Sequence, residues 1–190
     1  MEKLEIICYH ATDSEFASKI VNDKFVCRYN ASHWLGNGIY FYQDVALAKW
    51  WTTNPSKQFG CTINNPALVK CKISIDSNRV LDIRTLEGYN KYIEEFNNFF
   101  DIAYKYRPKG NKKINFKKFR CIFFDYLFEQ NKYDLLIAPF SANNQPYLSR
   151  SGNKTFRENM HIIFTEEQIC LSEQHQELIL DKSVIILERR

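Results

Sequence analysis

The chain has 190 residues, of which 45% are hydrophobic and 25% charged, an average balance for a soluble globular protein and a length that suits one domain. Its six cysteines are scattered and form no C-x-x-C pair, which argues against a zinc site and a disulfide framework. No run approaches the ~18 apolar residues of a membrane span, and the N-terminus lacks the apolar core of a secretory signal. These features exclude a helical membrane protein and a disulfide-rich secreted domain. They predict a single cytoplasmic domain over residues 1–190, with free thiols and no membrane partner.

Basic residues are concentrated in one segment. The formal net charge is +4, but residues 104–120 contain eight Lys or Arg and no acid. Without these eight, 18 of the 26 basic residues remain against 22 acidic ones, a net charge of −4. The segment also carries four aromatic residues, Tyr104, Tyr106, Phe116 and Phe119. This mixture allows three interpretations: a surface for RNA or DNA, a dock for an acidic inhibitor protein, or a solvated face whose aromatics belong to the core.

Hydrophobic periodicity predicts an α+β fold, with mainly antiparallel strands at both ends of the sequence and helices between and around them. Residues 4–9 suit a buried strand, and Thr12-Asp13-Ser14-Glu15 has the form of a capping box for a helix that ends near residue 23. A strand over 38–42 precedes Asp44, a helix-capping residue type, and a short alanine-rich helix. Longer helices are expected over 86–106 and 116–131. Further strands are expected at 67–75, 79–83, 135–139, 161–164, 168–171 and 184–187.

Two short motifs stand in the N-terminal part of the chain. Tyr9-His10-Ala11-Thr12 ends the first predicted strand at the start of a predicted helix. Gly36-Asn37-Gly38-Ile39-Tyr40-Phe41 leads into the second predicted strand. Two glycines spaced in this way permit a tight turn and a close approach of the backbone to another group.

Together the two motifs resemble the NAD-binding core of ADP-ribosyltransferases of the diphtheria-toxin and poly(ADP-ribose) polymerase type, whose site is a His-Tyr-Glu triad. The resemblance is closest over residues 7–51. It implies a split, ADP-ribosyltransferase-like sheet, NAD as the substrate and no metal. It also implies that His10 binds the 2′-hydroxyl of the adenosine ribose and that Tyr40 stacks on the nicotinamide ring. The other residues that it places around the dinucleotide are Ala11, Thr12, Gly36, Gly38, Tyr42 and Trp51, with Trp50 as the alternative to Trp51.

In that family a later strand delivers the third residue, a glutamate. The matching stretch here is residues 164–171, FTEEQICL, and the alignment places Gln168 at the first position of the strand. Glu166 or Glu167 would match only if the strand starts earlier. A glutamine supplies hydrogen bonds but neither a charge nor a proton acceptor, which favours single transfer over the building of a polymer.

The sequence therefore predicts an NAD-dependent mono-ADP-ribosyltransferase with His10, Tyr40 and Gln168 as its catalytic residues. A stand-alone domain of this kind suggests a bacterial or phage toxin or an antiviral defence effector, restrained by an antitoxin or other inhibitor. The acceptor would be a macromolecule, either protein or nucleic acid bound through residues 104–120. Two alternatives stay open: NAD glycohydrolysis with water as the acceptor, and an inactive module that binds NAD or ADP-ribose, which Gln168 and Ala11 favour.

Overall fold

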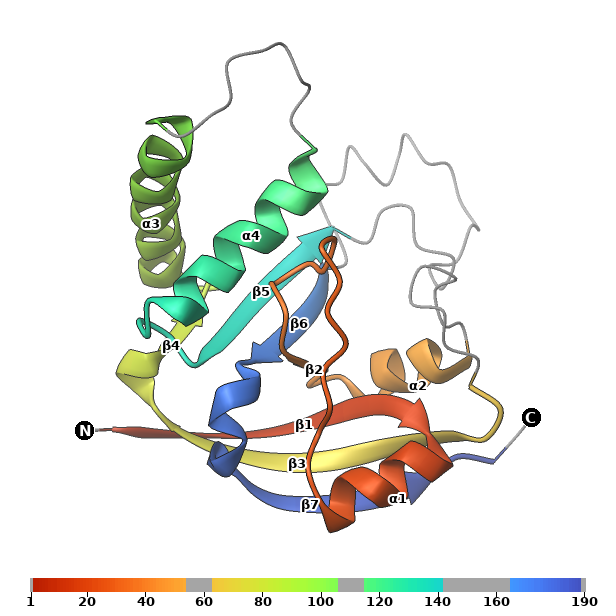
Figure 1. Cartoon of the computed structure of the whole chain (residues 1–190). Helices are drawn as coiled ribbons and strands as arrows, with labels where there is room; N and C mark the ends of the chain where they lie inside the picture. The colour runs from red at the N-terminus through yellow and green to blue at the C-terminus, as the bar shows by residue number, and fades with distance from the viewer. Residues whose placement is uncertain (1, 54–62, 106–114, 142–164, 189–190) are drawn as a thin grey trace, which may run out of the picture.

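The computed structural model describes residues 2–53, 63–105, 115–141 and 165–188 (Figure 1). The strands are β1 (Lys3–Asp13), β2 (Ile39–Phe41), β3 (Pro66–Asp76), β4 (Val80–Asp82), β5 (Leu135–Ser141), β6 (Thr165–Leu171) and β7 (Ile179–Ile186). The helices are α1 (Ser14–Asn22), α2 (Val45–Thr53), α3 (Leu86–Lys105) and α4 (Phe116–Glu129), with short 3-10 turns η2 (Ser77–Arg79) and η3 (Glu173–Leu178). The chain thus has the predicted α+β fold.

The strands form two sheets. One has the order β1-β3-β7 and the other the order β2-β6-β5-β4. Neighbouring strands are antiparallel except for β4 and β5, which are parallel. Helices α1 and α2 pack against the first sheet, where α1 contacts β3 and β7 and α2 contacts β1 and β3 (Figure 1). The prediction of mainly antiparallel sheets with peripheral helices is confirmed.

One hydrophobic core cluster joins the two sheets. Because side chains alternate along a strand, every second residue of each sheet points into the space between them. The core cluster contains, among others, Ile6, Cys8, Val69, Cys71 and Ile73 from the first sheet and Ile39, Phe41, Leu135, Ile137 and Ile169 from the second. Each of these side chains is at most 4% exposed. The two sheets therefore pack as one unit, while the extent of the domain over residues 1–190 stays a prediction.

A second cluster lies on the opposite face of the β2-β6-β5-β4 sheet, where α3 and α4 cover it (Figure 1). Its buried members include Phe99, Phe123, Phe124 and Leu127 from the helices and Leu81, Leu136, Ala138 and Cys170 from the strands. Large aromatic side chains dominate this contact, and each one buried contributes about 1.5–3 kcal/mol. The packing places α4 directly over the sheet that carries the second sequence motif.

Most strand boundaries differ from the sequence prediction by one or two residues, and those of β1, β6 and β7 differ by more. β7 begins at Ile179, five residues before the predicted start at residue 184. β1 continues to Asp13, so that Asp13 rather than Thr12 caps α1, its carboxylate accepting a hydrogen bond from the backbone of Glu15 at 3.1 Å. β6 begins at Thr165, three residues before the predicted start at Gln168, because β5 continues far enough to pair with it. The strand predicted at 161–164 lies outside the described residues.

No helix in the described ranges is long and apolar enough to cross a membrane.

Candidate functional site

His10 lies in β1, three residues before its end, with its ring in edge contact with Phe25 and Phe41 at 5.1 and 6.0 Å between centroids. Its Nδ1 lies 2.8 Å from the backbone carbonyl oxygen of Tyr40. Because a carbonyl only accepts hydrogen bonds, Nδ1 carries the proton. Burial lowers the pKa of His10 below its ordinary value, although the bond to Tyr40 opposes this. The ring is therefore neutral at pH 7 and its Nε2 is a hydrogen-bond acceptor.

The lowered pKa of His10 predicts a loss of stability in acid. As the pH falls below about 6.5, the unfolded chain takes up a proton at this position before the folded chain does. The free energy of unfolding should therefore fall with pH in that window, by at most about 1.4 kcal/mol per pH unit from this one group. Urea unfolding at pH 7.5 and 5.5 checks this against His10→Asn, which keeps a donor for the Tyr40 carbonyl but cannot titrate. Wild type should lose more stability than the variant, and equal losses would contradict the prediction.

Tyr40 lies at the centre of β2, and its hydroxyl forms hydrogen bonds with the backbone of the preceding turn. The hydroxyl accepts a hydrogen bond from the backbone N–H of Leu35 at 2.7 Å and donates one to the carbonyl of Gly36 at 2.8 Å. Burial raises the pKa of Tyr40 far above its ordinary value, so the phenol stays neutral. The ring lies 5.5 Å from that of His33. The ring, and not the hydroxyl, is thus what Tyr40 can offer to a ligand.

The two glycines before β2 allow contacts with the protein's own elements. Gly36 has φ +78°, and a Cβ built there would lie 2.7 Å from Asp125 Oδ1 on α4. A Cβ built on Gly38 would lie 2.5 Å from the carbonyl oxygen of Leu171 on β6. The Asn37 side chain also donates to Asp125 Oδ2 at 2.8 Å, which ties the turn to α4. These contacts account for both glycines, and a dinucleotide contact at either of them stays a prediction.

Because β6 starts at Thr165, Glu166 is part of the strand and lies on the face that carries Tyr40. The register pairs Tyr40 with Cys170, and alternation along β6 puts Gln168 and Glu166 on the same side as Cys170. The prediction that Gln168 begins the strand is wrong, because β6 begins at Thr165. The strand starts early enough for Glu166 or Glu167 to be the residue that matches the family glutamate.

Glu166 forms the centre of a buried polar cluster, and its exposed fraction is 1%. Its Oε1 accepts hydrogen bonds from Gln168 Nε2 at 2.6 Å and from Trp51 Nε1 at 3.2 Å. Trp51 comes from α2, and the ring of Tyr42 stacks on it at 6.1 Å. Glu167 differs: its side chain is 42% exposed and pairs with Arg84 at 2.8 Å. Of the two glutamates, only Glu166 joins the predicted site residues.

A cation and two aromatic rings adjoin this cluster. The β5–β6 register pairs Phe140 with Glu166, so the two side chains lie on one face. The Phe140 ring meets Trp34 edge-on at 4.5 Å, and the Arg120 guanidinium lies 5.1 Å from the Trp34 ring and 5.8 Å from the Phe140 ring. Arg120 belongs to the basic segment 104–120, but nothing in the sequence indicated that it would lie beside Trp34 and Phe140, because only the register of the sheet and the docking of α4 bring the three together.

The remaining predicted residues lie near the ends of β1 and β2. Ala11 packs in a small cluster with Tyr42 and with residues of α2. Thr12 is half-buried and pairs with Ala67 of β3. Tyr42 is 8% exposed and bridges Tyr9 through two backbone hydrogen bonds of 2.8 and 2.9 Å. The structure thus connects Tyr42 and Trp51 directly, and it connects Trp51 to Gln168 through Glu166.

The side chains of the basic segment are described only from residue 115 onward. Phe119 packs against Phe96, Phe99 and Phe100 of α3, with centroid distances between 5.4 and 6.2 Å. It therefore packs against the core, as one of the three interpretations of the segment predicts for its aromatic residues. Phe116, in contrast, is 78% exposed. The side chains of Tyr104 and Tyr106 lie outside the described residues.

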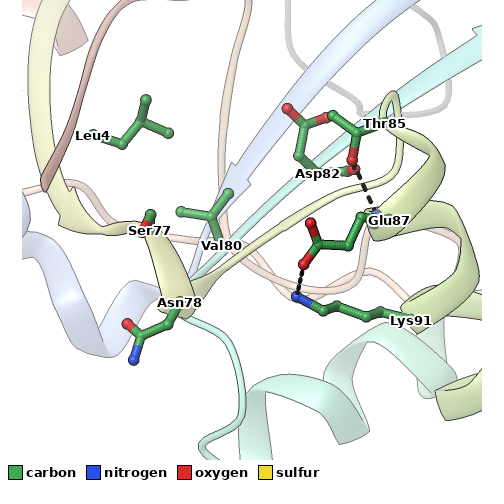
Figure 2. A pocket seen from close by; sticks show the side chains of 9 residues that line it. Leu4, Ser77, Asn78, Val80, Asp82, Thr85, Glu87 and Lys91 are labelled. Carbon is green, nitrogen blue, oxygen red and sulfur yellow. Dashed lines mark hydrogen bonds and ion pairs between the residues drawn. The ribbon is translucent and has the colours of Figure 1, made fainter. Parts of the chain in front are cut away.

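A separate hollow of about 400 Å³ lies away from these residues. Figure 2 shows its lining, which includes Leu4, Val80, Thr85 and an ion pair of 2.6 Å between Glu87 and Lys91. None of the predicted site residues lines it. Within the described ranges, no group of three or more His, Cys, Asp or Glu side chains could hold a metal ion.

Comparison with known proteins leaves the family open. No family model matches the chain, and no solved structure matches it. An uncharacterized protein of Methanocaldococcus jannaschii is 26% identical to this chain over an alignment 189 residues long. The alignment covers 90% of this chain and 84% of the relative. This chain is similar to the archaeal protein over nearly its whole length.

Proposed function

We propose that this protein is an NAD-dependent mono-ADP-ribosyltransferase with Glu166, and not Gln168, as its acidic residue. The observation that supports this most directly is the start of β6 at Thr165, which puts Glu166 on the face that carries Tyr40 and next to Trp51. A histidine, a tyrosine and a glutamate then come from three neighbouring strands. This is the residue set of the family that the two sequence motifs resemble.

Cleavage of the nicotinamide–ribose bond passes through a cation of the oxocarbenium type, as glycoside hydrolysis does. The Glu166 carboxylate supplies the negative charge that stabilises such a cation, and it can accept the proton of the incoming acceptor. Trp51 and Gln168 both donate to its Oε1, which fixes the orientation of the carboxylate. In this proposal Gln168 is a positioning residue.

His10 and the aromatic residues have the properties needed to hold the dinucleotide. The neutral ring of His10 donates through Nδ1 to Tyr40, which leaves Nε2 to accept a hydrogen bond from a ribose hydroxyl. The flat faces of Tyr40 and Trp51 would grip the nicotinamide ring and favour the positive charge that develops beside them. Ala11 and Thr12 follow His10 directly, and we place them at the carboxamide side of the ligand.

Further parts of the proposal come from the sequence. Scattered free thiols favour a reducing compartment, and so we place the protein in the cytoplasm. We also infer single transfer, a role as a toxin or defence effector, and an antitoxin or other protein that restrains it.

The experiment that tests the activity incubates the purified protein with NAD labelled in its adenylate part, together with separated pools of protein, DNA and RNA. We expect release of nicotinamide and transfer of the label to a macromolecule. Release without any labelled macromolecule would identify an NAD glycohydrolase instead. Binding of NAD without release over many hours would identify an inactive binding module.

His10→Asn should lower the rate of nicotinamide release about tenfold, the effect of one lost hydrogen bond of ordinary strength. The asparagine amide can still donate to the Tyr40 carbonyl, but it has no acceptor where Nε2 was. His175→Asn is the matched control, because His175 lies on η3 and contacts Asp134 and Glu177 rather than the site. An equal loss in both variants, or no loss in His10→Asn, would exclude the proposed role of His10.

A further inference from the structure

We propose that the acceptor is a single-stranded nucleic acid, bound across the first turns of α4 and the ring pair of Trp34 and Phe140. We call this the α4 surface; it consists of Trp34, Phe116, Lys117, Lys118, Arg120 and Phe140. The exposed cations and aromatic rings of these residues support its binding of nucleic acid. Its role in presenting the acceptor rests on the proposed function.

The first turn of α4 combines exposed charge with an exposed aromatic ring. Phe116 is 78% exposed, and Lys117 and Lys118 are exposed beside it. Neither lysine forms an ion pair within the described part of the chain, and the first turn contains no acidic residue. The helix N-terminus adds a partial positive charge of its own. Exposed cations beside an exposed ring are the combination that binds phosphates and stacks unpaired bases.

Arg120 continues this surface one turn further. Its guanidinium lies over the rings of Trp34 and Phe140, and among the described residues no carboxylate pairs with it. Its Nε is buried and has no hydrogen-bond partner within the same residues. A half-buried cation without a counter-ion is costly, and a phosphate group would neutralise it with the geometry that guanidinium favours. Trp34 and Phe140 are both partly exposed and so can also contact a base.

The α4 surface adjoins the proposed catalytic carboxylate, because Phe140 is the cross-strand partner of Glu166. A nucleic-acid strand bound at the α4 surface would present a nucleophilic nitrogen or oxygen to the anomeric carbon of the nicotinamide ribose. The new bond to that carbon forms as the carbon–nitrogen bond breaks, and the bonding pair leaves with nicotinamide. The proton of the nucleophile passes to the Glu166 carboxylate and from it to water.

Fluorescence anisotropy with labelled single-stranded DNA and RNA oligonucleotides of mixed sequence tests the surface directly. We expect binding that weakens steeply between about 50 and 200 mM salt, because bound phosphates release counter-ions. The double variant Lys117→Glu/Lys118→Glu should bind at least tenfold more weakly and show a shallower salt dependence. Phe116→Ala should also bind about tenfold more weakly, the loss of one stacked base, with the salt dependence unchanged.

The matched control is Lys3→Glu/Lys24→Glu, which changes the net charge equally at two exposed lysines on β1 and after α1. This variant should bind oligonucleotides as wild type does. Equal weakening in both double variants would overturn the α4 surface, since it would reduce the effect to net charge. Label transfer from NAD to proteins alone would overturn the acceptor role of the α4 surface and favour an acidic protein partner.

The two proposals can fail separately. If wild type binds oligonucleotides through the α4 surface but releases no nicotinamide from NAD, nucleic-acid binding is supported and the transferase with its acceptor role is excluded. If wild type releases nicotinamide but binds no oligonucleotide, the α4 surface is excluded and the NAD chemistry is supported.

Discussion

Glu166→Gln should lower the rate of nicotinamide release by about 10²–10³-fold, the usual effect of removing one electrostatic contact to a transition state. The substitution keeps the size of the side chain and one oxygen that can accept from Trp51 and Gln168. It removes the charge that would stabilise the ribose cation and the base that would take the acceptor's proton. Initial rates of nicotinamide release, measured at saturating NAD, check this, and thermal melting verifies that the variant is folded.

Glu167→Gln is the control for that experiment. The two glutamates are neighbours in β6, but the Glu167 side chain is exposed and pairs with Arg84. Its substitution should leave the rate close to that of wild type. Gln168→Ala should reduce the rate less than Glu166→Gln does, because Trp51 still holds the carboxylate. If Gln168→Ala inactivates the protein while Glu166→Gln does not, the original prediction of a His-Tyr-Gln site is correct and Glu166 is only structural.

Gly38→Ala should destabilise the protein by about 2–3 kcal/mol, in the range of overpacked sites. The added Cβ would lie 2.5 Å from the Leu171 carbonyl oxygen and 2.7 Å from Cys170 Sγ. Leu171 pairs with Ile39 in the β2–β6 ladder, so its carbonyl can move only if the two strands separate. For a chain of this length the loss corresponds to a drop of roughly 5–10 °C in melting temperature. Calorimetry or circular dichroism measures it.

This substitution also separates the two explanations of the glycine turn. If Gly38 serves the approach to β6, the melting temperature falls whether or not NAD is present. If Gly38 serves only the dinucleotide, the melting temperature of the free protein stays at the wild-type value and only the activity falls. That second outcome would contradict the close packing of Gly38 on Leu171.

Local sequence patterns were sufficient to predict most of the elements. The periodic apolar positions of α1 and α3 predicted their extents to within one residue, because an amphipathic helix repeats its pattern over its own length. Asp44 caps α2 as predicted, accepting from the backbone of Ala46 at 2.7 Å. The pairing of His10 with Tyr40 came from the spacing of two motifs rather than from periodicity, and the structure links them through one hydrogen bond.

The start of β6 could not be predicted in this way. Residues 165–167 are Thr-Glu-Glu, a polar run without strand periodicity, and they become strand only because β5 extends alongside them. Strand register depends on a partner distant in sequence. The burial of Glu166 against Trp51 of α2 follows from that register, as does the position of Phe140 opposite it.

The sequence by itself thus determined the fold class, most of the elements and the two motifs that suggest an NAD site. Those features depend on residues near one another in the chain, whose propensities and spacing are written locally. Only the tertiary structure decided that Glu166 and not Glu167 joins the site, that Gly38 approaches β6, and that Arg120 lies over the rings of Trp34 and Phe140. Each of these depends on contacts between segments that are far apart in the chain, and such contacts arise only when the sheets and helices pack together.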